Sequence, residues 1–133
     1  MVKRIATAAL LLALFPIAGC GSKDPHEQAI VDMLEVMEDM GDTLADVKDK
    51  PTAEAAKPKL EKVAKRMEAV KKRMDEIGEP EKAKEEALKK KYEERMKKAA
   101  GKMMKEMMRV TMNPEIGKAI GDVMKSMEPG PMK

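Results

Sequence analysis

The sequence predicts an all-α fold, an antiparallel helical hairpin extended to a three-helix bundle with a short fourth helix. Apolar residues recur at alternating steps of three and four, the spacing of one face of a helix. After the first 19 residues the only aromatic residue is Tyr92. Lys, Glu, Met and Ala are the commonest residues, and with Leu they favour helices over strands.

The first 19 residues have the layout of a secretory signal peptide. Lys3 and Arg4 form a basic start, and residues 5–15 form an apolar core too short to span a bilayer. Small residues then precede Cys20, the only cysteine of the chain. The run Ile17-Ala18-Gly19-Cys20 resembles the lipobox of bacterial lipoproteins.

This resemblance implies cleavage before Cys20, a diacylglyceryl thioether on Cys20, and a fatty acyl chain such as palmitate on the new amino terminus. The implied location is the bacterial cell envelope, with the chain lipid-anchored and facing the periplasm or the exterior. Gly21 stands where an Asp would favour retention in the inner membrane, so the outer membrane is preferred. Residues 20–25 would be the lipidated cysteine and a tether spanning only about 12 Å.

The helical domain is expected over residues 26–128, and its first two helices form the hairpin. One apolar row runs from Ile30 to Val47 and a second, with identical spacing, from Leu60 to Ile77. The first helix is rich in acids and the second in bases, which favours their pairing.

The start of the second helix is left open by the sequence. Thr52 is a candidate N-cap, but Pro58 would then lie beyond the first turn and kink the helix. Gly78 and Pro80 are expected to end it.

A third helix is expected from Glu81 to Met112, with the ring of Tyr92 buried and its hydroxyl in solvent. Asn113 followed by Pro114 predicts the start of a short fourth helix, which can cover the projecting end of the third. Its inward residues would be Ile116, Ile120, Val123 and Met127. Residues 129–133 are expected to form a disordered tail.

Composition argues against two classes of function. An exported chain of nearly neutral mature charge, without aromatic side chains to stack on bases, is unsuited to nucleic acid. One histidine and no free thiol do not supply the groups of a hydrolytic or redox enzyme, so no catalytic residue and no cofactor is assigned.

We therefore expect a non-enzymatic binding or structural module of unknown ligand, attached to the bilayer through Cys20. An envelope protein is a possible partner, and the oligomeric state is open. The mature part resembles small uncharacterised exported helical proteins, most distinctly over residues 53–60, and this resemblance implies no active residues.

The chain has 15 methionines, and five of them lie between residues 103 and 112. One interpretation is adaptable core filling, and another is a plastic groove for apolar segments of other exported proteins. The alternative from a different class is soft-metal binding or tolerance, because thioethers suit Cu(I) and Ag(I). Its ligands would be Met103, Met104, Met107 and Met108, and His26 could assist.

Overall fold

A computed structural model describes residues 24–127 of the chain as four helices. These are α1 (Pro25–Ala45), α2 (Lys50–Ile77), α3 (Lys82–Thr111) and α4 (Pro114–Ser126). The predicted all-α fold with a short fourth helix is confirmed. The leader, Cys20 and the tail at 129–133 lie outside the described residues.

Side-chain caps fix the starts of α1, α2 and α4, whereas Glu81 before α3 makes no capping hydrogen bond with its side chain. Asp24 accepts hydrogen bonds from the backbone N–H groups of His26 and Glu27, at 2.9 and 3.4 Å. At α2 the cap is Asp49, whose carboxylate accepts from the backbone of Thr52 at 2.9 Å while the Thr52 hydroxyl accepts from the backbone of Asp49 at 3.0 Å. Thr52 is therefore the partner of the cap, and the helix starts earlier than a Thr52 cap would place it.

The later boundaries follow the sequence signals. Pro58 lies inside α2, which continues through it to Ile77. Gly78 then turns the chain at a φ of +70°, a conformation that favours glycine. At α4 the predicted cap is confirmed, because the Asn113 side chain accepts from the backbone N–H groups of Glu115 and Ile116 at 3.1 and 3.3 Å.

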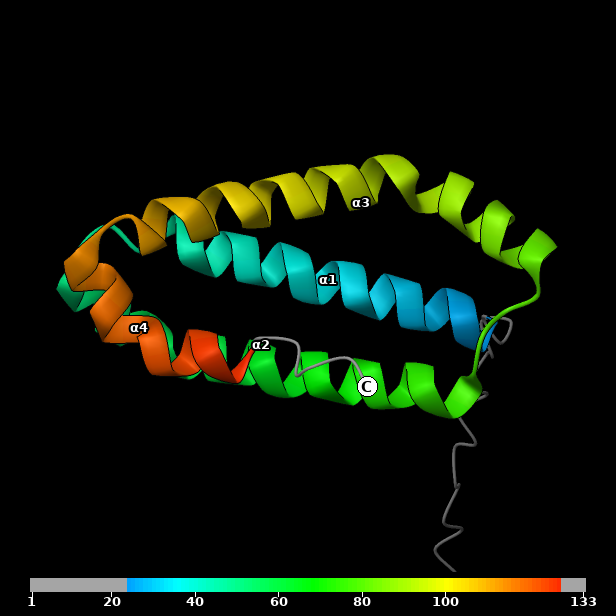
Figure 1. Ribbon diagram of the computed structural model, residues 1–133, viewed down its shortest axis with the longest axis horizontal. Helices are drawn as coiled ribbons and strands as arrows, with labels where there is room; N and C mark the ends of the chain where they lie inside the picture. The colour runs from blue at the N-terminus through cyan, green and yellow to red at the C-terminus, as the bar shows by residue number, and fades with distance from the viewer. Residues whose placement is uncertain (1–23, 128–133) are drawn as a thin grey trace, which may run out of the picture.

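The helices are arranged around α1, which packs against α2 on one side and α3 on the other (Figure 1). Among the four described helices, α2 and α3 make no contact with each other. The short α4 packs mainly along α2 and makes fewer contacts with α3, so it covers the second helix more than the end of the third. Because α2 and α3 do not meet, the bundle is not closed on the side of α1 where α4 lies.

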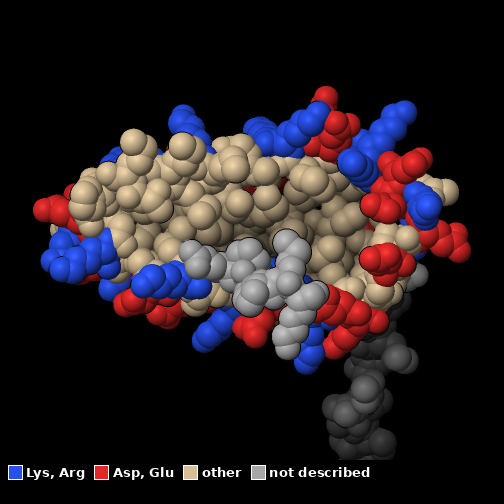
Figure 2. Space-filling view, viewed as in Figure 1, with Lys and Arg blue, Asp and Glu red and all other residues tan. Residues whose placement is uncertain are grey.

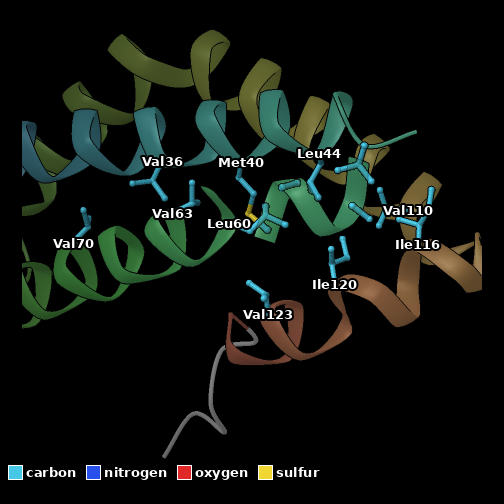
Figure 3. Close-up of a cluster of buried hydrophobic side chains, with 13 residues drawn as sticks. Val36, Met40, Leu44, Leu60, Val63, Val70, Val110, Ile116, Ile120 and Val123 are labelled. Atoms are coloured by element: carbon cyan, nitrogen blue, oxygen red, sulfur yellow. The ribbon is translucent and has the colours of Figure 1, made fainter. Parts of the chain in front are cut away.

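The core lies at the end of the molecule where all four helices meet (Figure 3). Leu44 of α1, Leu60 of α2 and Ile120 of α4 are completely buried there. At the same end Arg109 of α3 donates hydrogen bonds to the backbone carbonyls of Leu44 and Val47, both at 2.7 Å. The guanidinium thus satisfies carbonyl groups at the C-terminal end of α1.

We predict that Leu60→Ala lowers the free energy of unfolding by about 2–5 kcal/mol, because it leaves a cavity in this core. Urea unfolding followed by circular dichroism measures the change. Met112→Ala is the matched control, since that side chain is 80% exposed and its loss is expected to change stability by less than about 0.5 kcal/mol. Equal losses in the two variants would contradict the assignment of Leu60 to the core.

Candidate functional site

Apart from Met40, which is buried in the core, the methionines of residues 24–127 fall into two sets, and the larger one is named here the methionine face. Six of its members are partly buried against the core: Met33, Met67, Met103, Met107, Met124 and Met127. Met37, Met74 and Met96 extend it by one or two helical turns along the same helix faces. Figure 2 shows a broad uncharged surface between α3 and the α2–α4 pair, with charged side chains along its border.

The methionine face is open because α4 is too short to cover it. At 1.5 Å per residue, the 13 residues of α4 span about 20 Å, whereas the 28 residues of α2 and the 30 of α3 span about 42 and 45 Å. Met74, near the C-terminal end of α2, and Met96, in the middle of α3, are each 39% exposed. The uncovered part therefore offers roughly the length of a second helix like α4.

A shallow pocket of about 460 Å³ lies where α4 ends against α2. Met67 and Met127 contribute thioethers to it, and Lys65 and Lys71 contribute ammonium groups. Glu61 and Glu68 are also part of its wall. The pocket therefore combines an apolar part with charges of both signs at the border of the methionine face.

The smaller set of methionines points away from the core on the outer side of α3. Met104, Met108 and Met112 are 66%, 60% and 80% exposed and follow each other at four-residue steps. We name them the outer stripe. The short α4 does not cover Met104 and Met108.

The four predicted metal ligands therefore do not gather at one place. Met103 and Met107 face inward and Met104 and Met108 face outward, because adjacent helical residues point about 100° apart. His26, the predicted assisting ligand, lies at the start of α1 with its Nδ1 3.2 Å from the Lys84 ammonium. In residues 24–127 no three His, Cys, Asp or Glu side chains form a group that could hold a metal ion.

Ion pairs between acidic residues at α1 and basic residues of α3 hold α3 in place. Arg95 makes a two-point contact with Glu38, with its Nε and Nη2 donating at 2.8 and 2.7 Å. Lys84 pairs with Asp24, and Lys102 pairs with Asp42. The hydrogen bond from Arg95 holds the pKa of Glu38 below its usual value.

Glu27 anchors the middle of α3 to α1. Its carboxylate accepts hydrogen bonds from the Lys91 ammonium and the Tyr92 hydroxyl, both at 2.6 Å. The Tyr92 hydroxyl, which was expected to reach solvent, therefore also has a partner on α1. This hydrogen bond raises the pKa of the Tyr92 hydroxyl, because losing its proton would place a second negative charge beside Glu27.

Along its other edge, α1 forms ion pairs with α2. Arg66 pairs with Asp39 and lies 3.8 Å from Glu35, and Arg73 pairs with Asp32. The two helices that border the methionine face, α2 and α3, thus each form ion pairs with a different edge of the acidic side of α1. The sequence predicted the charge pairing of α1 with α2, but it did not identify the equivalent pairing with α3. The acid-free, base-rich stretch 95–105 of α3 is the signal that could have found it.

Comparisons with protein-family models, curated proteins and solved structures gave no match to this chain. No helix within residues 24–127 is long and apolar enough to cross a membrane.

We predict that Glu38→Gln lowers stability at pH 7 by about 0.2–1 kcal/mol, the range for an exposed ion pair. Because the folded-state pKa of Glu38 is depressed, its contribution is complete above the unfolded-state value of about 4.3 and is lost as the pH falls through the folded-state pKa. Denaturant titrations at pH 7 and below pH ~3 should show the two proteins converging in acid.

Glu61→Gln, a neutralised carboxylate on the exposed surface of α2, controls for the general effect of removing a charge. A difference between wild type and Glu38→Gln that persists unchanged in acid would mean that the ion pair is not its cause.

Proposed function

We propose that this protein is a lipid-anchored, non-enzymatic binding module of the bacterial cell envelope. The anchor is the lipid expected on Cys20, and the ligand is an amphipathic helix of another envelope protein. The binding surface is the uncovered part of the methionine face. The observation that carries the proposal is that α2 and α3 both pack on α1 and not on each other, which leaves this surface open.

The choice of a helix as ligand rests on α4. It packs against both α2 and α3 and inserts Ile116, Ile120 and Val123, which follow each other at steps of four and three. Both α2 and α3 continue beyond the end of α4 at Ser126. A partner helix with that apolar spacing would extend the interface that α4 has already established.

The chemistry of the surface suits a partner of variable sequence. Methionine is unbranched and polarisable, so a surface built from it can repack around different apolar side chains. Rigid β-branched side chains would fix one complementary shape instead. The charges of both signs around the pocket at the end of α4 can orient a helix without requiring one particular sequence.

We predict that a fluorescent peptide with the sequence of residues 113–127 binds the protein and that changing Met33, Met37 and Met96 together to Gln weakens this binding at least about tenfold. The reason is that apolar burial contributes about 25 cal/mol per Å² and these three side chains belong to the methionine face. Fluorescence anisotropy measures the affinity.

Two variants serve as controls for the peptide experiment. Changing Met104, Met108 and Met112 to Gln makes the same chemical change on the outer stripe and should leave peptide affinity unchanged. Changing Met33, Met37 and Met96 to Leu should keep binding, because leucine preserves apolar volume. Equal affinity of the face and stripe Gln variants would reject the methionine face as the binding surface.

Binding of Cu(I) or Ag(I) remains a second candidate function, favoured by the exposure of the outer stripe. Met104 and Met108, or Met108 and Met112, are one helical turn apart and open to solvent, so two thioethers could reach one soft ion. The inward pair Met103 and Met107 has a sufficient explanation in core packing.

A Cu(I) competition titration tests this candidate on three proteins: wild type, Met104/Met108/Met112→Leu and Met103/Met107→Leu. If the stripe is a metal site, only its Leu variant loses high-affinity binding. Weak binding of equal strength by all three proteins would remove the metal function, and the Leu substitutions preserve the apolar volume on which folding depends.

A further inference from the structure

The outer stripe is an apolar surface that neither the core nor the proposed helix-binding surface uses. Its three thioethers occupy successive turns at the C-terminal end of α3, on the side away from α1. Exposed apolar side chains that follow one another in this way mark contact sites for proteins or membranes more often than single exposed residues do.

The charged residues around the outer stripe indicate what kind of surface it contacts. From Arg95 to Arg109, α3 carries six basic residues and one acid, Glu106. Arg95, Lys102 and Arg109 are engaged with α1, whereas Lys97 and Lys105 are exposed within two turns of the stripe, and Lys97 also pairs with Glu93 of the same helix. Thioethers flanked by lysines on one helix match an anionic bilayer surface, with the apolar groups in the acyl boundary and the ammonium groups at the phosphates.

The position of the tether agrees with such a contact. Asp24, the first described residue, pairs with Lys84 at the N-terminal end of α3. Only three residues separate it from Cys20, so this link can reach at most about 14 Å, and packed helices lie about 8–10 Å apart. A lipid at Cys20 can therefore reach the plane that touches the outer side of α3.

We propose that α3 lies along an anionic phospholipid bilayer, held at its N-terminal end by the lipid on Cys20 and at its C-terminal end by the outer stripe with Lys97 and Lys105. This inference rests on the lipid anchor proposed above. The two attachments are separated by about 20 residues of helix, or about 30 Å, and they orient the domain rather than leaving it to rotate on its tether. The methionine face then opens sideways, parallel to the membrane.

A label on α3 tests this orientation in the acylated full-length protein reconstituted into vesicles. Because Cys20 is the only cysteine and its thiol is consumed by the lipid, Met104→Cys introduces one labelling site for an environment-sensitive fluorophore. Lys72→Cys, on the exposed surface of α2, is the control position. In phosphatidylglycerol-containing vesicles the label at 104 should be quenched by lipid-borne quencher, and the label at 72 should remain aqueous.

Charge and apolar contributions are separated by further variants. Lys97→Gln and Lys105→Gln should each weaken the membrane contact of the labelled helix about fivefold, as expected for a basic residue near an anionic surface. Lys62→Gln and Lys72→Gln on α2 should have no effect, and pure phosphatidylcholine vesicles should reduce the contact. Changing Met108 and Met112 to Gln should weaken it and changing them to Leu should not.

The contact of α3 with the bilayer is overturned if labels at 104 and 72 report the same aqueous environment, or if vesicle charge has no influence. Mass spectrometry of the same preparation shows separately whether Cys20 carries lipid. If it does not, the anchor is rejected, and the label at 104 is read on a chain that also carries Cys20→Ser, so that position 104 remains the single labelling site, as vesicles are added. A label that stays aqueous at saturating anionic lipid then rejects the α3 contact as well.

Discussion

The architecture depends on the charge of α1. This helix carries six acidic residues and no Lys or Arg, while α2 has nine basic and five acidic residues and α3 has eleven and five. The two basic helices repel each other and are each attracted to one edge of the acidic side of α1. Exposed ion pairs contribute little stability individually, so charge determines which helices lie side by side and the apolar core supplies most of the folding free energy.

This arrangement explains why an apolar surface is left open. In a closed three-helix bundle the inner sides of α2 and α3 would bury each other, whereas here both pack on α1 without contacting each other, and only the short α4 bridges them. The side chains bordering the gap are mostly methionines, which tolerate both partial exposure and varied contacts. The open surface proposed to bind a helix is thus a consequence of the charge pattern that keeps α2 and α3 apart.

Much of the fold was predictable because helical periodicity is a local property. The apolar rows located α1 and α2, Gly78 located the end of α2, and Asn113 with Pro114 located the start of α4. The cap at Asp49 was missed because Thr52, its partner, is an equally good cap residue when the sequence is considered alone. The long-range choices were harder: periodicity shows that Met103 and Met104 face different directions, but not which of those directions another helix covers.

The ties between α1 and α3 also set the order in which the chain can fold. The hydrogen bonds between their side chains, and those from Arg109 to the end of α1, join residues 57 to 65 positions apart. The chain emerges with α1 first, and α2 is the earliest neighbour that can neutralise it. The opposite edge of α1 stays solvated and negatively charged until the chain has emerged past residue 109. The first helix therefore gains its full set of neighbours only when the polypeptide is nearly complete.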